Sequence, residues 1–99
     1  MFIISGAFDV KEEYRDDIIK MSLDLIPQSL EEAGCLSYRF FEDVSEPNRF
    51  LFFERWNSRQ DIEAHFGKPY FLSFAERFPS MIKGEAVIEI HEIALTESV

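Results

Sequence analysis

The chain has 99 residues and a formal net charge of −9, and 46% of its residues are hydrophobic, including 11 phenylalanines. This length fits a single domain, which we expect to cover residues 1–99. The negative charge disfavours nucleic acid and anionic membranes as partners, because both attract lysine and arginine. No stretch reaches the ~18 apolar residues of a membrane span, and the N-terminus lacks the basic start of a signal peptide. We therefore expect a cytoplasmic protein without nucleic-acid or membrane partners.

Hydrophobic periodicity in the first third of the chain predicts a strand followed by a helix. The apolar run from Phe2 to Val10 ends at the charged segment KEEYRDD and predicts a first strand. Beyond Lys11 the apolar residues repeat at helical spacing, at Tyr14, Ile18, Met21, Leu25 and Leu30. Gly34 is a favourable residue just past a helix, so we expect this helix to end at Ala33.

The next two strands are predicted to form a hairpin. The segments Cys35–Asp43 and Arg49–Trp56 carry the apolar residues of strands, and the turn residues of VSEPN lie between them. Ser58 followed by Asp61 has the pattern of a helix N-cap, so a helix should begin near Arg59.

The remaining elements complete a ferredoxin-like plan. Pro69 suits the first turn of a helix over Tyr70–Phe78, MIKGE is typical of a connection, and Ala86–Leu95 has the pattern of a last strand. With right-handed crossovers this order predicts an α+β fold, ferredoxin-like βαββαβ with a four-stranded antiparallel sheet. Helices cover only one face of such a sheet, whereas Phe50 to Trp56 is apolar in both registers. We therefore expect a homodimer in which a second copy covers the other face.

The third predicted strand places one carboxylate among aromatic residues. Glu54 lies between Phe52 and Trp56 on one strand face, where burial costs free energy unless the carboxyl is paired, hydrogen-bonded or protonated. On the following helix, His65 falls beside the apolar stripe that faces the sheet. Trp56, Glu54 and His65 are therefore candidates for one shared pocket. The alternatives are that Trp56 is a core residue, that Glu54 bonds an arginine or the backbone, and that His65 has no chemical role.

Other residues with possible chemistry carry weaker signals. Cys35 is the only cysteine and cannot form an internal disulfide, so we interpret it as a buried apolar residue. His91 lies in the last predicted strand and is interpreted as structural or exposed. The two histidines have no metal-ligand spacing, and no glycine-rich phosphate loop is present. We therefore expect no metal and no NAD, FAD or ATP.

Two segments carry a resemblance to a known family. EEAGCLSYRF (31–40) and FFERWNSRQDIEAHFGKPYF (52–71) resemble the antibiotic biosynthesis monooxygenase (ABM) family of dimeric α+β barrel proteins. The second segment fits the loose family pattern E-x-[WY]-x8-H, which falls on Glu54, Trp56 and His65 and is followed by a proline and an aromatic residue. The resemblance covers nearly the whole chain. It implies a dimeric α+β barrel and one of several chemistries, including quinol or polyketide oxygenation, haem degradation and isomerisation of a phosphorylated sugar.

The match to each branch of the family is partial. In the polyketide monooxygenases the pocket contains an Asn and a Tyr, and Phe52 and Ile62 occupy these positions here. In the haem-degrading branch, the tryptophan against the porphyrin and the axial histidine correspond to His65 and Ala75. The histidine of the quinol-monooxygenase-like and isomerase-like members corresponds to His65, while their second histidine falls on Tyr70.

The resemblance implies a cofactor-independent monooxygenase that acts on a small aromatic or quinol-type substrate with O2. Such an enzyme deprotonates the substrate and holds a radical pair in a dry cavity, which needs a base with a pKa near neutrality. The expected catalytic residues are His65 as the base, Glu54 as the group that orients it, and Tyr70 as the next candidate. The expected substrate-binding residues are Trp56, Phe52 and Phe74, which would stack on the ring. The alternatives are a proton-shifting isomerase of a small carbonyl or sugar substrate, with Glu54 or Tyr70 as its acid, and a dimer that binds a small ligand without turnover.

Overall fold

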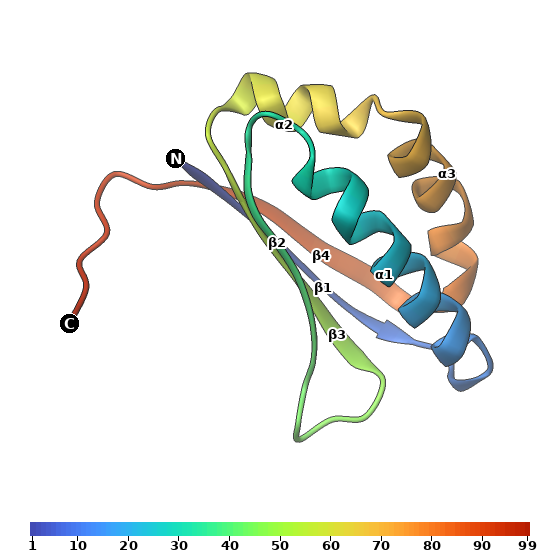
Figure 1. The fold of residues 1–99 in the computed structure, drawn as a ribbon. Coiled ribbons are helices and arrows are strands. Elements are labelled where there is room, and N and C mark those ends of the chain that lie inside the picture. The colour runs from blue at the N-terminus through green and yellow to red at the C-terminus, as the bar shows by residue number, and fades with distance from the viewer.

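Four antiparallel strands form one sheet in the order β2-β3-β1-β4, and the helices all lie on one face of it (Figure 1). The computed structural model describes residues 1–99. Its strands and helices are β1 (Phe2–Val10), α1 (Arg15–Leu30), β2 (Cys35–Glu42), β3 (Arg49–Trp56), α2 (Arg59–Phe66), α3 (Pro69–Arg77) and β4 (Ile82–Glu92). Single 3-10 turns precede α1 and follow α3. This is the predicted ferredoxin-like α+β fold with a four-stranded antiparallel sheet, so the fold prediction is confirmed.

Burial alternates along the two central strands, β1 and β3, as expected when one face of a sheet is covered. Their even-numbered residues face the helices and form the core with residues of α1, α2 and the turn after α3. The buried hydrophobic residues are Ile4, Phe8, Val10, Ile18, Leu25, Tyr38, Phe50, Phe52, Trp56, Ile62 and Met81. The hydrophobic core therefore lies between the sheet and the helices.

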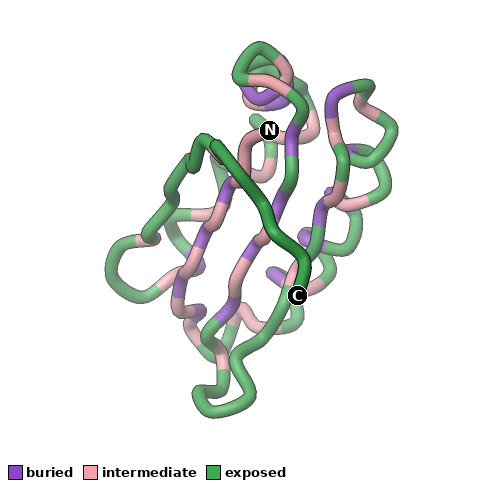
Figure 2. Tube along the Cα trace, turned by 90° about the vertical axis from the view of Figure 1, so that its left-hand side faces the viewer, coloured by how far each residue is buried: buried purple, intermediate pink, exposed green.

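The opposite face of the sheet is open, and Figure 2 looks onto it. Its central rows contain half-buried and exposed residues, among them Ile3, Ala7, Phe41, Leu51, Phe53 and Val87. Several apolar side chains are thus left on a face that no element of the chain covers. No helix of the structure is long and apolar enough to cross a bilayer.

The start of α2 is fixed by the cap that the sequence predicts. The Ser58 hydroxyl oxygen accepts a hydrogen bond from the Asp61 backbone N–H at 3.1 Å and donates to Asp61 Oδ2 at 2.7 Å. Such a cap satisfies one of the N–H groups left unpaired at a helix start. The predicted start at Arg59 is confirmed, and it orients the helix so that Ile62 and His65 are buried against the sheet.

The end of α1 differs from the prediction. The helix ends at Leu30, and residues 31–34 form turns, so Gly34 is not the residue that ends the helix. Gly34 instead lies against Asp61, because a Cβ built on Gly34 would lie 2.0 Å from Asp61 Cγ and 2.3 Å from Asp61 Cβ. The glycine is required for close approach between the loop before β2 and the capped start of α2.

The bounds of β4 also differ from the predicted Ala86–Leu95. The strand begins earlier, at Ile82, because Gly84 has a positive φ of 64° and accompanies a register shift that lets Ile82 and Lys83 pair with the end of β1. It ends earlier, at Glu92, because this residue pairs with Phe2, the first residue of β1. Beyond this point β4 has no neighbouring strand with which to form a ladder.

The close approach at Gly34 predicts that Gly34→Ala destabilises the fold by about 1–3 kcal/mol, as overpacked sites do. The added methyl group must displace Asp61, which also serves the cap of α2. The measurement is the midpoint of urea unfolding.

Gly67→Ala is the matched control for this substitution. A Cβ at Gly67 meets only ordinary contacts, the nearest being 3.6 Å from the Ala64 carbonyl oxygen, so its unfolding midpoint should stay close to that of the wild type. Equal midpoints for the two alanine variants would contradict the role assigned to Gly34.

Candidate functional site

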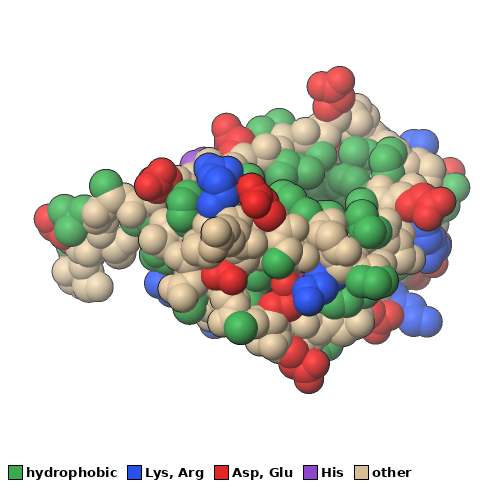
Figure 3. Space-filling view, turned by 90° about the horizontal axis from the view of Figure 1, so that it is seen from above, with side chains coloured by type: hydrophobic (Ala, Val, Ile, Leu, Met, Phe, Trp, Pro, Cys, Tyr) green, Lys and Arg blue, Asp and Glu red, His purple; other side chains and the backbone are tan.

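A cavity of about 430 Å³ lies between the sheet and the helices, lined almost wholly by hydrocarbon. Figure 3 shows apolar side chains gathered around a hollow in the face of the molecule seen from above. The lining residues are Ile4, Gly6, Phe8, Leu25, Tyr38, Phe52, Glu54, Phe66, Phe71, Phe74, Ala75, Phe78 and Ile88. Ile88 of β4 is 59% exposed, which places an opening of the cavity beside this edge strand.

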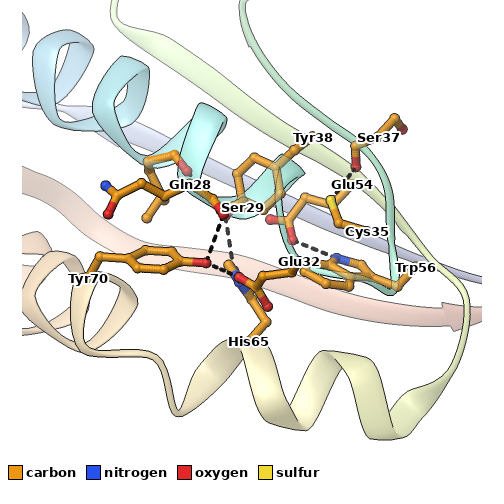
Figure 4. Close-up of polar contacts among 11 residues, drawn as sticks. Gln28, Ser29, Glu32, Cys35, Ser37, Tyr38, Glu54, Trp56, His65 and Tyr70 are labelled. Atoms are coloured by element: carbon orange, nitrogen blue, oxygen red, sulfur yellow. Dashed lines mark hydrogen bonds and ion pairs between the residues drawn. The ribbon is translucent and has the colours of Figure 1, made fainter.

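Glu54 is the only acidic or basic residue in the cavity wall, and it is 5% exposed. Strand pairing places it in the middle of the sheet, opposite Ile4 of β1 and Tyr38 of β2. The Trp56 indole N–H donates a hydrogen bond of 3.0 Å to Glu54 Oε1 (Figure 4). Burial raises the pKa of Glu54 to about 7, although the hydrogen bond from Trp56 and the neighbouring Tyr38 hydroxyl work in the opposite direction. The carboxyl can therefore both accept and donate a proton near neutral pH.

The second oxygen of Glu54 is directed toward the cavity. Within hydrogen-bond distance only Oε1 has a protein donor, and Ser22 Oγ is the only fully buried side-chain atom without a partner. Oε2 must therefore be reachable from the cavity that Glu54 lines. A ligand in this cavity would meet one carboxyl oxygen and, beside it, the Tyr38 ring and hydroxyl.

His65 is fully buried behind the cavity wall rather than in it. Its Nδ1 lies 2.7 Å from Glu32 Oε2, and its Nε2 lies 3.3 Å from the Tyr38 hydroxyl. Because a carboxylate only accepts, Nδ1 carries the proton in the neutral ring and Nε2 accepts from Tyr38. Burial lowers the pKa of His65, and Glu32 opposes this shift. The imidazole is thus held neutral in one orientation, with the Trp56 ring centroid 4.7 Å away.

Glu32 connects this buried network to the surface. Its side chain is 10% exposed and lies in the turn between α1 and β2. The Tyr70 hydroxyl of α3 donates a hydrogen bond to the same Glu32 oxygen, and its oxygen also lies 3.2 Å from the Gln28 carbonyl oxygen (Figure 4). Burial and the neighbouring Glu32 both raise the pKa of Tyr70. Glu54, Tyr38, His65 and Glu32 therefore form a row of adjacent titratable groups from the cavity to the outside.

The six residues expected at the site lie in one region but in two layers. Glu54, Phe52 and Phe74 line the cavity. Trp56 and His65 are completely buried behind it, and Tyr70 faces Glu32. The expected pairing of Glu54 with His65 is replaced by two separate contacts, Glu54 with Trp56 and His65 with Glu32.

Two residues of the network, Tyr38 and Glu32, are absent from the sequence-based candidates. Tyr38 could have been found by counting back from the predicted hairpin turn, because the register pairs it with Glu54. Glu32 carries no such signal, since its contact with His65 joins residues 33 positions apart in different elements.

Cys35 and His91 lie outside the cavity wall. Burial raises the pKa of the half-buried Cys35 to about 11, which keeps it a thiol at neutral pH. His91 lies on the open face of the sheet, with Nε2 2.8 Å from the Ser5 hydroxyl oxygen. No group of three or more His, Cys, Asp or Glu side chains is arranged to hold a metal ion.

Comparison with known proteins connects this site to a family. The chain is 40% identical over 96 residues to protein sll1783 of Synechocystis sp., covering 97% of this chain and 65% of that relative's length, and that relative's name states no function. A crystal structure of an antibiotic biosynthesis monooxygenase is 20% identical, with a TM-score of 0.88 over 96% of this chain and 100% of its own. Rv0793 from Mycobacterium tuberculosis is 20% identical, with a TM-score of 0.91 over 98% of both chains.

The two solved structures show a shared fold, because their identity to this chain is low. Family membership rests on the sequence itself. The family model described as antibiotic biosynthesis monooxygenase matches residues 1–77, which include β1 to α3 and every residue of the Glu54 and His65 contacts. The chain therefore belongs to the antibiotic biosynthesis monooxygenase family.

Proposed function

We propose that the chain is a cofactor-independent monooxygenase that oxidises a small aromatic or quinol-type substrate with O2. One observation carries this proposal: a single carboxyl group, with a pKa near 7, faces a cavity walled by aromatic and aliphatic side chains. Oxidation without a cofactor needs a base to form an electron-rich anion and a dry space in which the anion meets O2. The cavity has both properties. A cytoplasmic location is part of the same proposal and rests on the sequence.

In this proposal Glu54 is the group that takes the substrate proton. An ordinary carboxylate is a weak base for a phenol, whose pKa is ~10. Burial raises the pKa of Glu54 and so makes the transfer of a proton from a phenol to this carboxylate about 3 kcal/mol less unfavourable. General bases work best when their pKa lies near the operating pH, where the ionised form is available. His65, the base expected from the sequence, has no open path to a ligand in the cavity, so we assign it a supporting role.

The supporting role of His65 is to carry the proton onward. Tyr38 donates to His65 Nε2, which leaves the Tyr38 oxygen free to accept a proton from Glu54, and His65 Nδ1 donates to Glu32. A stepwise shift along these groups moves a proton from the cavity to Glu32 without admitting water. Tyr70 keeps Glu32 in place through its own hydrogen bond. This arrangement restores the Glu54 carboxylate between turnovers.

The cavity wall also bears on the isomerase alternative. No lysine or arginine lines the cavity, so it has no group to hold a phosphate. The chemistry of the wall therefore supports a neutral, largely apolar substrate. Turnover that proceeds equally fast under argon would favour a proton-shifting isomerase and contradict oxygenation.

Glu54→Gln is expected to lower kcat for O2 uptake by ~10²–10⁴-fold, the usual contribution of a general base. The assay measures oxygen consumption with a panel of hydroquinones and naphthols. For the wild type kcat should rise with pH through about 7, because only the ionised carboxyl accepts a proton, and this rise should vanish in the variant.

The matched control for this prediction is Glu63→Gln, which removes an exposed carboxylate on α2. This variant should keep the wild-type rate and pH profile. Full activity of Glu54→Gln with a good substrate would exclude Glu54 as the base.

The relay predicts that Tyr38→Phe and His65→Ala lower kcat by similar factors and that the double variant is no slower than either single one. Residues that act in one path are non-additive in this way, whereas independent packing defects add. KM should change little for His65→Ala, because His65 is buried behind the cavity wall and does not line it. Additive losses in kcat, measured by the same oxygen assay, would contradict a shared path.

We also propose that the chain forms a homodimer through the open face of the sheet. The apolar side chains on this face support the proposal, because soluble monomers rarely expose an apolar patch of more than a few hundred Å². A dimer built this way leaves both helix layers outside, as the family resemblance implies. The two cavities would then lie on opposite sides of the paired sheets.

Phe53→Glu is expected to shift the protein from dimer to monomer, because it places a carboxylate at the centre of the open face, where β3 pairs with β1 and β2. Sedimentation at micromolar concentration measures the mass. Leu72→Glu, a change at a 54% exposed residue of α3, should leave the dimer intact. A wild-type chain that sediments as a monomer would overturn the dimer.

A further inference from the structure

The cavity gives a ligand only one place to make a strong polar contact. Apart from Glu54 and the Tyr38 hydroxyl beside it, its wall consists of hydrocarbon side chains and Gly6. The Trp56 indole holds Glu54 Oε1, so Oε2 is the atom left for a ligand. A bound aromatic molecule must therefore direct its polar atom toward this end and its ring toward Phe52, Phe74 and the other apolar residues.

The hydrogen-bonding role of Glu54 depends on its protonation. A carboxylate only accepts hydrogen bonds, whereas a protonated carboxyl also donates one. The carboxylate thus suits a ligand hydroxyl group, and the acid suits a ligand carbonyl oxygen. A carbonyl facing the carboxylate would be a buried acceptor against an acceptor, which is costly in a low-dielectric site.

We propose that Glu54 selects the ligand by its hydrogen-bonding role: the carboxylate retains hydroxyl-bearing aromatic molecules and rejects their carbonyl-bearing oxidised counterparts. The inference deepens the proposed function and rests on it for the identity of the two ligands. Its consequence is that the oxidised product leaves readily once the relay through Tyr38 and His65 has removed the substrate proton from Glu54, because the restored carboxylate has no hydrogen to give to the product carbonyl. Product inhibition is thereby reduced above neutral pH.

Glu54 is the group in the cavity wall that changes its protonation state near pH 7. The titratable groups that act on it are Tyr38 and Cys35 of β2 and Glu32 after α1, while His65 of α2 and Tyr70 of α3 lie behind them in contact with Tyr38 and Glu32. From β1 and β4 it faces Ile4 and Ile88, which do not titrate. The pKa values of Tyr38, Tyr70 and Cys35 are raised, that of Cys35 to about 11, and the pKa of His65 is lowered.

The size of the expected effect follows from the ionised fraction of Glu54. With a pKa of about 7 this fraction rises from roughly one tenth at pH 6 to roughly nine tenths at pH 8. A ligand that binds one form only has an apparent Kd divided by the fraction of that form. The apparent Kd should therefore change by up to about tenfold over this interval, in opposite directions for the two ligand types.

The experiment is calorimetric titration under argon of 1-naphthol, which donates a hydrogen bond, and of 1-tetralone, which only accepts one. Naphthol stays neutral up to pH 8, because phenols ionise at pH ~10. The Kd of 1-naphthol should fall and that of 1-tetralone should rise between pH 6 and pH 8. Glu54→Gln, whose amide both donates and accepts and does not titrate, should bind both ligands with a flat pH profile, while Glu63→Gln should match the wild type.

Three results would overturn the inference: the same pH trend for both ligands, a trend that persists in Glu54→Gln, or no binding of either ligand at any pH. Should Glu54→Gln fail to fold, infrared spectroscopy of the wild type decides the question. At pH 7 the protonated-carboxyl band should grow on addition of 1-tetralone and shrink on addition of 1-naphthol, and an unchanged band would overturn the inference.

The ligand selection by Glu54 and the proposed monooxygenase function can be contradicted independently of each other. Opposite pH trends without oxygen uptake from any substrate would retain the selection by Glu54 and contradict the monooxygenase. Oxygen uptake with identical pH trends for the two ligands would retain the monooxygenase and contradict the selection by Glu54.

Discussion

The burial of the Glu54 carboxyl is the constraint on which the rest of the site depends. A carboxyl in the middle of a sheet face, flanked by Phe52 and Trp56, loses its hydration and must find other partners or stay protonated. The chain supplies one strong donor, the Trp56 indole, and leaves the second oxygen to the cavity. Burial keeps the pKa of the carboxyl near 7, and Glu54 is the one charged residue in the cavity wall.

The residues behind Glu54 explain why a tryptophan and a histidine are buried so deeply. Trp56 fixes the carboxyl, and its ring packs on His65, which is held from its other side by Glu32. An apolar core would be simpler to build, because each buried polar group needs a partner with good geometry. Here hydrogen bonds join Tyr38 to His65, His65 to Glu32 and Tyr70 to Glu32, which orders the side chains between the cavity and the surface.

Most of the fold could be predicted from the sequence, because it depends on local patterns: the alternation in residues 49–56, the Ser58 cap and the hairpin turn. The predictions that were wrong concern element bounds that are set by tertiary contacts. Gly34 serves the close contact with Asp61 rather than the end of α1, and the bounds of β4 depend on where β1 begins and ends. In the same way, periodicity placed His65 toward the sheet, yet only the packed structure shows that Glu54, and not His65, reaches the cavity.

The cost of keeping Glu54 is itself an argument for its use. A carboxyl whose pKa is about 7 in the folded chain and ~4.5 when unfolded binds more protons in the folded state, so folding stability falls as the pH rises through this interval. Above pH 7 the loss amounts to about 3 kcal/mol, against a total of ~5–15 kcal/mol for a small domain. Glutamine or leucine would avoid this cost at the same position. A strained or unfavourable group of this kind is typical of functional sites, where the surrounding fold compensates for it.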